Sequence, residues 1–273
     1  MSHVHEAPRA VLADSHWEIN YLRQTLAVAE ADIRKLIRDP IELLTRMIQP
    51  VLWLLIFGQV LTRARAIPTG GISYLDFMTP GILAQSVLFG AIFYGISLIW
   101  ERDLGIIQKF LVSPAARSSL VLGRAISSTV RSVCQMVLVF FLALILRVHV
   151  RMDIGALLGI TAAVILGSAV FSTVSLVAAC IVKSRERFMG IGQVLTMPLF
   201  FASNAIYPLT LMPYWLRVVS KVNPLTYQVD ALRRLMIVGG STAFGVRVDF
   251  GVLLLAFAIL VAIATHLYPK IIT

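Results

Sequence analysis

The chain has 273 residues, of which 58% are hydrophobic and only 14% are charged. A soluble domain carries about a quarter charged residues, so lipid rather than water is the expected solvent for most of this chain. The net charge of +10 does not indicate a nucleic-acid partner, because Lys and Arg cluster at the ends of apolar runs, where they anchor membrane helices. The composition predicts an all-α integral membrane protein.

The N-terminal region is the most polar part of the chain. We expect residues 1–15 to form a disordered cytoplasmic tail. Residues 16–38 then show apolar side chains at alternating spacings of three and four, with charged residues between them. This pattern predicts an amphipathic interfacial helix along the membrane surface, with a helix packed on a soluble partner as the alternative. Residues 39–273 are expected to form one transmembrane domain.

Six apolar runs within that domain predict six transmembrane helices, which place both termini on the same side. Pro50 is expected to kink the first of them. Thirteen of the 24 Lys and Arg residues fall in segments on the side of the termini and nine on the other, so the termini are predicted to be cytoplasmic. The runs cover roughly residues 41–61, 74–100, 125–146, 154–182, 188–206 and 248–268.

One charged residue lies deep within a span, where a charge is costly and often functional. Arg131 shares a polar stripe, at helical spacing, with Arg124, Ser128 and Gln135. The stripe could face a wet cavity, or Arg131 could extend toward the cytoplasm if its helix begins late.

Between the second and third spans lies the segment "ERDLGIIQKFLVSPAARSSLVLGR", residues 101–124. Over 101–112 its apolar residues share one arc of a helix and its charged residues the other. The residue before Pro114 avoids helical dihedrals, so the helix ends there. The segment is either an interfacial linker or a lever that binds a cytoplasmic partner.

Residues 207–237, before the last span, are interrupted by Pro208, Pro213 and Pro224. The amphipathic pieces between these prolines could form a loop on the outer surface of the bilayer. They could instead form two short helices that enter the outer leaflet, which would require burial in protein.

These features resemble the membrane subunit of a type 2 ATP-binding-cassette (ABC) exporter, of the daunorubicin-resistance and nodulation-exporter branch. The resemblance covers nearly the whole chain after about residue 16, and its specific parts are residues 101–124 and "YPLTLMPYWLRVVSKVNPLTYQVDALR" at 207–233. It implies that 101–113 is a coupling helix, which inserts into a cleft of a separate ATPase subunit. The coupling positions that it implies are Glu101, Arg102, Gly105, Lys109, Pro114 and Arg117.

The resemblance also implies that two permease chains, identical or homologous, meet on a twofold axis with the substrate between them. The second and fifth spans would line this route, although ordinary packing explains the same residues equally well. The implied pathway residues are Tyr94, Ser97, Gln193, Thr196, Phe200 and Asn204. Those of the outer re-entrant region are Asn223, Pro224, Tyr227, Asp230 and Arg234.

The chain contains no "GxxxxGK[ST]" phosphate loop, so ATP and Mg²⁺ are expected on the partner ATPase, with no catalytic residue, metal or cofactor on this chain. Cys134 and Cys180 lie in apolar runs and are predicted to be buried thiols. The predicted function is export of a hydrophobic or amphipathic molecule, either drug-like or a lipid, through the cytoplasmic (inner) membrane. Lipid-linked polysaccharide is the alternative substrate.

Two other classes of protein fit less well. An ion-coupled secondary transporter normally uses carboxylates within its spans, whereas the acidic residues here lie in tails, connections or span ends. A membrane enzyme would require a cluster of catalytic residues, but neither "HExxH" nor "GxSxG" occurs.

Overall fold

The computed structural model describes residues 41–65, 67–104, 117–182 and 184–267, together with Glu30, Arg34 and Arg38, and for 42, 43 and 117–119 it describes the backbone only. The predicted tail and nearly all of the predicted surface helix therefore lie outside the described residues. Within that helix, Arg34 donates a hydrogen bond to Glu30 at 2.6 Å, one turn away.

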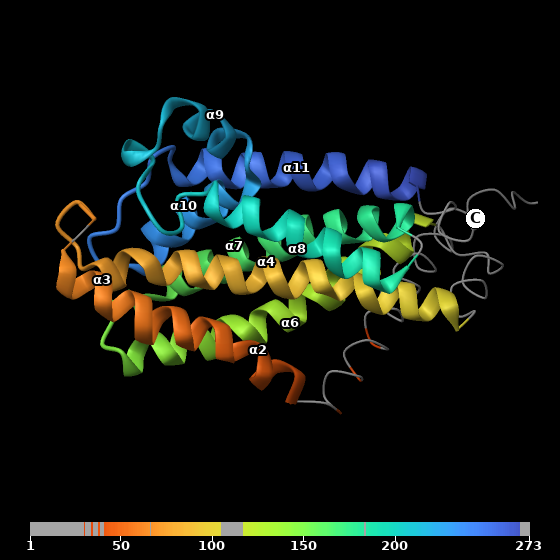
Figure 1. Cartoon of the computed structure of the whole chain (residues 1–273), viewed down its shortest axis with the longest axis horizontal. Coiled ribbons are helices and arrows are strands. Elements are labelled where there is room, and N and C mark those ends of the chain that lie inside the picture. Colours follow the sequence, from red (N-terminus) through yellow and green to blue (C-terminus); the bar gives the residue numbers. More distant parts are fainter. Residues whose placement is uncertain are drawn as a thin grey trace, which may run out of the picture.

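The described chain folds as a bundle of helices whose axes run along its longest dimension (Figure 1). Two shorter helices stand between α8 and the last long helix. In chain order the elements are α2 (Ile41–Leu52), the π-helix η1 (Trp53–Gly58), α3 (Gln59–Ala64), α4 (Tyr74–Asp103), α6 (Arg117–Ile145), α7 (Ile154–Ile181), α8 (Arg185–Phe201), the 3₁₀ turn η2 (Leu209–Leu211), α9 (Tyr214–Val222), α10 (Pro224–Met236) and α11 (Val246–Leu267).

Five segments of the described chain are long and apolar enough to cross a membrane. They correspond to the predicted first, second, third, fourth and sixth spans, and they identify the chain as a multi-pass membrane protein. The helix at the predicted fifth span, α8, has 17 residues and is not one of the five. The five segments are Leu44–Ala64, Tyr74–Asp103, Leu120–Ile145, Ile154–Ile181 and Val246–Leu267.

Polar side chains define where several helices begin. Ser73, Asp153 and Ser184 accept hydrogen bonds from backbone N–H groups in the first turns of α4, α7 and α8. Asn223 does the same for α10, which begins with Pro224 at the position where a proline costs no hydrogen bond. The N–H of Ala156 and the neighbouring Arg151 hold the pKa of Asp153 below its usual range, because both favour the charged carboxylate.

The first span departs from α-helical geometry where Pro50 was expected to kink it. Pro50 lies inside α2, and the six residues Trp53–Gly58 that follow form a π-helix before α3 resumes the α form. Proline lacks the N–H of a regular helix turn, and its ring collides with the preceding carbonyl. A π-turn is a second feature at which helices kink, and here it follows the proline on its C-terminal side.

The centre of the bundle is α7, which packs against α4, α6, α10 and α11. Its buried face carries small and hydroxyl residues. Ser168 lies 2.8 Å from the hydroxyl of Ser132 on α6, and Ser175 accepts a hydrogen bond of 3.1 Å from the backbone N–H of Gly95 on α4. Small residues allow helices in lipid to approach closely, and hydroxyl groups bond across the interface.

The bundle has two ends, which we name after residues of α4. At the Asp103 end, the C-terminal parts of α4, α7 and α11 meet the beginnings of α6 and α8 in one buried cluster. At the Asp76 end, the Asp76 carboxylate accepts a hydrogen bond of 3.1 Å from the N–H of His149, in the turn between α6 and α7. Each end therefore brings together residues that are far apart in the sequence.

The two short helices before the last span differ in their surroundings. Along α9, most large apolar side chains are exposed. Of the 13 residues of α10, ten are buried, among them Gln228, which donates a hydrogen bond of 3.4 Å to the Ala163 carbonyl of α7. The helix α10 packs between α4, α7 and α11 and therefore belongs to the core. The alternative prediction for this segment, a loop on the outer surface of the bilayer, did not include such burial.

A close approach in this core gives a test of the packing. A Cβ added at Gly81 of α4 would lie 2.5 Å from the Ala205 carbonyl oxygen, whereas one added at Gly251 of α11 would meet no neighbouring atom. Because overpacking costs about 1–3 kcal/mol, we expect Gly81→Ala to lower the unfolding midpoint in detergent. Gly251→Ala is the matched control and should leave it unchanged. Equal midpoints for the two variants would contradict the close contact.

Candidate functional site

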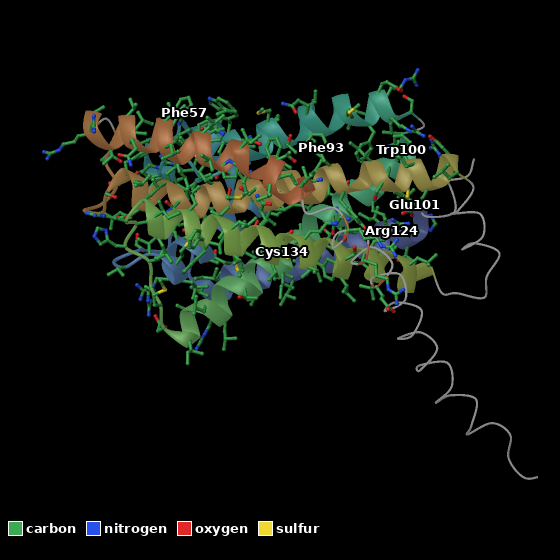
Figure 2. The ribbon with its side chains drawn as sticks, turned by 90° about the horizontal axis from the view of Figure 1, so that it is seen from below. Phe57, Phe93, Trp100, Glu101, Arg124 and Cys134 are labelled. Atoms are coloured by element: carbon green, nitrogen blue, oxygen red, sulfur yellow. The ribbon has the colours of Figure 1, made fainter. Side chains whose placement is uncertain are left out.

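The Asp103 end contains a buried ion pair between two helices. Arg124 of α6 donates to the carboxylate of Glu101 on the last turn of α4, and the two side chains are only 6% and 10% exposed. Figure 2 shows both residues at this end of the bundle. Breaking a buried pair leaves one charge without compensation, which is strongly destabilising. The pair therefore fixes the two helices that flank residues 105–116.

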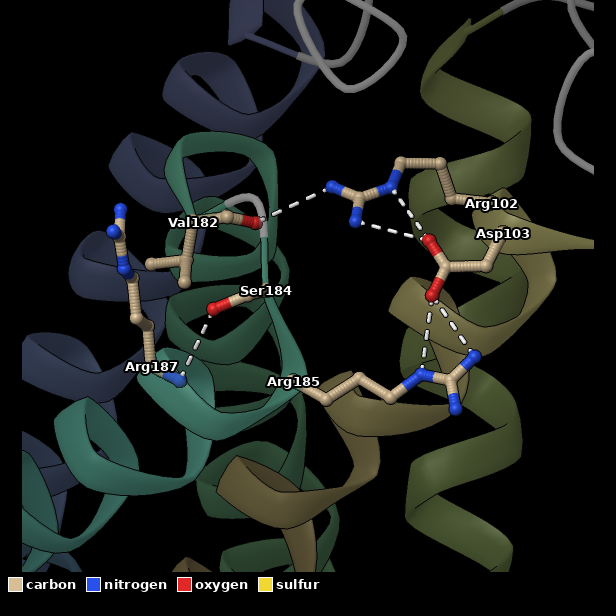
Figure 3. Close-up of polar contacts among 6 residues, drawn as sticks. All are labelled: Arg102, Asp103, Val182, Ser184, Arg185 and Arg187. Atoms are coloured by element: carbon tan, nitrogen blue, oxygen red, sulfur yellow. Dashed lines mark hydrogen bonds and ion pairs between the residues drawn. The ribbon is translucent and has the colours of Figure 1, made fainter.

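A second set of charges links the same end of α4 to α7 and α8 (Figure 3). Arg102 donates a hydrogen bond of 3.4 Å to the Val182 carbonyl, just after α7, and forms a 3.1 Å ion pair with Asp103. Asp103 in turn forms an ion pair of 2.9 Å with Arg185, the first residue of α8. The guanidinium of Arg185 lies 3.4 Å from the centroid of the Trp100 ring.

These contacts make the C-terminal turn of α4 a junction of four helices. Glu101 joins it to α6, Arg102 to the end of α7, and Asp103 to α8. The buried pair supplies most of the rigidity, because exposed ion pairs are each worth no more than about 1 kcal/mol. A displacement of this turn would therefore be passed to three other helices.

The Asp76 end has a polar cluster of its own around α10. Arg233 donates a hydrogen bond of 2.6 Å to the Asn204 carbonyl, and its guanidinium lies 3.8 Å from the centroid of the Phe77 ring. The carboxylate of Asp230 accepts a hydrogen bond of 2.8 Å from the N–H of Ala243. The cluster lines a cavity of about 280 Å³, and its contacts hold the irregular backbone on either side of α10.

The sequence model of ABC-2 type transporters matches residues 23–237, which include the charged turn at the end of α4 and all of α10. The chain belongs to the ABC-2 type transporter family. It is 28% identical to the ycf38 protein of Cyanophora paradoxa over 215 residues, which cover 78% of this chain and 74% of that protein.

Two further relatives are named as transport permeases. The daunorubicin resistance ABC transporter permease protein DrrB1 of Streptomyces coeruleorubidus is 28% identical over 235 residues, 85% of this chain and 80% of the relative. The inner membrane transport permease YadH of Escherichia coli strain K12 is 24% identical over 214 residues, 75% and 80% of the two chains. These matches and the apolar helices identify an ABC-2 permease.

The structure describes only some of the predicted coupling positions of this ABC-2 permease. The predicted separate helix does not begin at residue 101, because α4 continues through Asp103. Glu101 was also expected on the outward charged face, and it is instead buried against α6, since it pairs with Arg124. Arg117 begins α6, but its side chain is outside the described set. Three positions lie outside the described residues altogether: Gly105, Lys109 and Pro114.

The predicted pathway residues on α4 face another helix of the permease. Tyr94 is buried, and its hydroxyl lies 3.2 Å from that of Ser127 on α6. The hydroxyl of Ser97 donates to the carbonyl of Tyr94 within its own helix at 2.7 Å. In this arrangement Tyr94 contributes to packing between α4 and α6.

The predicted pathway residues on and after α8 do not form one surface. Gln193 is exposed, whereas Thr196 is buried and bonded to its own helix at 2.8 Å. Phe200 is buried edge-on against Trp53 of the π-helix, with 5.8 Å between ring centroids. Asn204 lies buried in the polar cluster beside α10. Along α8 the exposed Gln193 therefore lies on a different side from the buried residues.

The four residues of the polar stripe all contact neighbouring helices. Arg124 pairs with α4, and Ser128 lies within 3.1 Å of a serine hydroxyl on α7. The guanidinium of Arg131 lies 5.2 Å from the centroid of the Tyr94 ring. Gln135 donates to a methionine sulfur of α2 at 3.3 Å. The stripe thus joins α6 to three other helices.

The predicted outer residues stabilise the turns around α10. Asn223 caps this helix and donates to a carbonyl of α8 at 2.6 Å, and Tyr227 donates to a carbonyl of α9 at 2.6 Å. Pro224 begins the helix. Asp230 and Arg234 lie one turn apart and bond to different backbone groups of the segment that follows α10.

The sequence analysis did not single out several residues that the structure makes central. Asp103, Arg185 and Trp100 form the junction at the end of α4. The sequence offered one signal for it, a cluster of charged residues directly after an aromatic residue at the end of a span. Arg233 is buried while its neighbour Arg234 is exposed. Only the rotational phase of α10 against the bundle distinguishes these two adjacent arginines.

The buried pair predicts unequal effects of neighbouring substitutions. Glu101→Ala or Arg124→Ala should each destabilise the permease by about 3–5 kcal/mol, because each removes an ionic partner of a buried charge. The double variant should lose less than the sum of the two. Asp103→Ala, on the exposed side of the same turn, should cost no more than about 1 kcal/mol. Unfolding in mixed detergent micelles, followed by tryptophan fluorescence, measures all four variants. Additive losses would contradict the pairing.

Proposed function

We propose that this chain is the permease subunit of an ABC exporter, in which it forms the substrate pathway and responds to ATP hydrolysis by a separate nucleotide-binding subunit. The observation that carries the proposal is the family match over residues 23–237, which includes the charged end of α4. ATP and Mg²⁺ would bind to the partner, because the chain has no phosphate loop of its own. Its own role is binding and movement rather than catalysis.

The coupling step would use residues 101–113 and the positions around them. In the family, this segment inserts into a cleft of the ATPase, and Lys109 offers a charge for that contact. Movement of the segment would act first on the end of α4. The Glu101–Arg124 pair and the Asp103–Arg185 contact would then carry it into α6 and α8.

We propose that α8 is a sixth crossing, which would leave both termini in the cytoplasm. A helix of 17 residues is about 26 Å long, close to the hydrocarbon thickness of a bilayer. At its beginning, Arg185 contacts the last turn of α4, and just beyond its end the Asn204 carbonyl accepts from Arg233, which also stacks on Phe77 in the first turn of α4. Between those contacts α8 packs directly against α4.

The helices α9 and α10 would be the re-entrant helices of the outer leaflet. Asn223, between them, donates to the Leu199 carbonyl within α8, and Gln228 reaches Ala163 within α7. Leu199 lies in the last turn of α8, whereas Ala163 lies well inside α7. The contact with Ala163 supports entry of this hairpin into the membrane. Burial of α10 in protein meets the requirement for polar groups at that depth.

The permease would act with a second permease chain, identical or homologous, within the inner membrane. Large apolar side chains stand exposed along α2, η1 and α8, so lipid or the second chain must cover them. They include Ile48, Leu52, Leu55, Ile56, Ile191 and Val194.

The substrate would be a hydrophobic or amphipathic molecule, drug-like or lipid, with a lipid-linked polysaccharide as the alternative. The name of the relative DrrB1 refers to daunorubicin resistance, which supports the drug-like class for this chain.

Co-purification of an ATPase tests the proposed coupling. The tagged chain, extracted from its host in mild detergent, should bring down an ATP-hydrolysing subunit. Lys109→Ala should weaken that association about tenfold, since a charged hydrogen bond is worth about 1.5–3 kcal/mol. Lys221→Ala, an exposed lysine on α9, is the control and should have no effect. Stable wild-type protein without any ATPase would contradict the proposal and favour ion-coupled transport.

Cysteine labelling tests the proposed topology. In a background without Cys134 and Cys180, single cysteines would replace the exposed Ser241 and Glu186. With six crossings, Ser241→Cys should react with a membrane-impermeant maleimide from outside the intact membrane. Glu186→Cys should react only after permeabilisation. Labelling of both from the same side would exclude a crossing by α8.

A further inference from the structure

One buried acid near the Asp76 end has no part in the contacts described above. Asp249 lies in the first turn of α11 and is 0% exposed. Neither oxygen of its carboxyl group has a hydrogen-bond partner among the described residues. Buried polar side chains normally have such partners, so an exception requires an explanation. An ionised carboxylate here would be a buried charge with nothing to stabilise it.

The helices α10 and α11 lie side by side (Figure 1), and two titratable groups of α10 are within electrostatic range of Asp249. One is Tyr227, whose hydroxyl donates its single hydrogen to the Lys221 carbonyl at 2.6 Å. The other is Asp230, a second acid. The tyrosine therefore has no hydrogen left for Asp249, and the second acid opposes a negative charge there.

Within the described residues, the other groups near α11 present no cation to Asp249. The helix α7 contains no Asp, Glu, Lys, Arg or His. The arginines of α6 lie no further than its midpoint, toward the Asp103 end, where the C-terminal part of α11 packs. On α10, Arg233 and Arg234 donate to backbone carbonyls, and Arg247 of α11 is exposed. A charge on Asp249 would therefore lack a counter-ion.

The two neighbouring acids have opposite surroundings. The Asp230 carboxylate accepts hydrogen bonds from the N–H groups of Ala243 at 2.8 Å and Phe244 at 3.1 Å, and Arg233 adds a positive charge nearby. Donors and a cation both favour an ionised carboxylate, and Asp249 has neither. Two nearby carboxyl groups whose surroundings differ in this way share a proton unequally. The proton is expected on Asp249.

The buried polar atoms without partners around α10 all accept hydrogen bonds. Within the described residues they are the side-chain oxygens of Asn204 and Gln228 and both carboxyl oxygens of Asp249. The amide nitrogen of Asn204 lies 3.5 Å from the Asp230 carboxylate, and that of Gln228 lies 3.4 Å from the Ala163 carbonyl. These contacts fix which end of each amide is the oxygen. The region thus has a surplus of acceptors, and a proton on Asp249 supplies a donor while it removes a charge.

Other ways of stabilising an ionised Asp249 are weaker. The start of a helix favours an anion, but by less than the burial of an unpaired charge costs. Within the described residues, no group of three or more His, Cys, Asp or Glu side chains could hold a metal ion. The nearby cavity of about 280 Å³ is lined by Asp230 but not by Asp249. A proton requires neither a cavity nor further ligands.

We propose that Asp249 is a proton-binding site, whose carboxyl group is protonated in the folded permease while Asp230 beside it is ionised. The proton allows the start of α11 to pack against α10 without an uncompensated charge. Movement of α10 away from α11 would admit water to Asp249 and release the proton. The link between this release and movement of the outer hairpin rests on the proposed permease function, whereas protonation of Asp249 in the folded state does not.

Infrared spectroscopy tests the protonation directly, because a protonated carboxyl group has a C=O stretching band separate from those of carboxylates and amides. The permease in an ester-free detergent at neutral pH should show this band. Asp249→Asn should remove it, whereas Asp153→Asn, at the exposed cap of α7, should leave it unchanged. In the wild-type protein, aspartate with an isotope-labelled carboxyl carbon should shift the band, so the test does not depend on folding of the variant.

Unfolding at different pH values gives a second readout. An aspartate in the unfolded chain titrates at about pH 4, so above this pH folding of the wild type takes up a proton at Asp249. Its folding equilibrium constant, relative to that of Asp249→Asn, should fall about tenfold for each unit of rising pH until the folded protein also ionises. The ratio for Asp153→Asn should stay constant above neutrality, because Asp153 is ionised in both states. Tryptophan fluorescence in mixed micelles measures all three proteins.

Any of three results would overturn the proposal. The first is an infrared band that neither Asp249→Asn nor the isotope changes, and the second is a wild-type to Asp249→Asn ratio that does not vary with pH. The third is stabilisation by sodium chloride over choline chloride at equal ionic strength that Asp249→Asn abolishes, which would assign the site to a metal cation. These measurements contain no ATPase, so their failure leaves the proposed coupling intact, and failure of ATPase co-purification leaves the proton site intact.

Discussion

An apolar environment requires every backbone N–H and C=O group to find its partner within the protein. The long helices of this chain meet that requirement internally, but the stretch between α8 and α11 includes turns that do not. Side chains supply the missing partners there. Tyr74 donates to the Ile206 carbonyl at 3.0 Å, Asn223 to that of Leu199, and Arg233 to that of Asn204. The arrangement of α9 and α10 depends on these few bonds.

The charged residues are concentrated at the two ends of the bundle, and the kind of contact that they make differs between the ends. At the Asp76 end, Asp230 and Arg233 bond mainly to backbone groups, so their charges hold irregular segments in place. At the Asp103 end, charges pair with one another between helices. Backbone contacts favour a fixed structure, whereas ion pairs between helices are contacts through which one helix can move another. For this reason the Asp103 end is the one at which the proposed coupling to an ATPase would act.

The first span is linked to the α4 junction through α8. Trp53 of the π-helix packs against Phe200 in the last turn of α8, and Arg185 in its first turn pairs with Asp103 of α4. The two contacts lie at opposite ends of one packed helix, so a movement of α4 at the Asp103 end would act on the first span through α8.

The amino-acid sequence by itself determined the class of protein, the places of five spanning helices, the charged segment after the second span and the resemblance to ABC-2 permeases. Each of these depends on apolar length, charge or a local motif, which are properties of contiguous residues. Only the tertiary structure decided that Glu101 faces inward, because its partner Arg124 lies 23 residues away on another helix. It also decided that Arg233 rather than Arg234 is buried, and that aromatic rings of η1 and α4 line one groove. Helix phase and packing partners set these features, and neither is encoded in any single stretch of the chain.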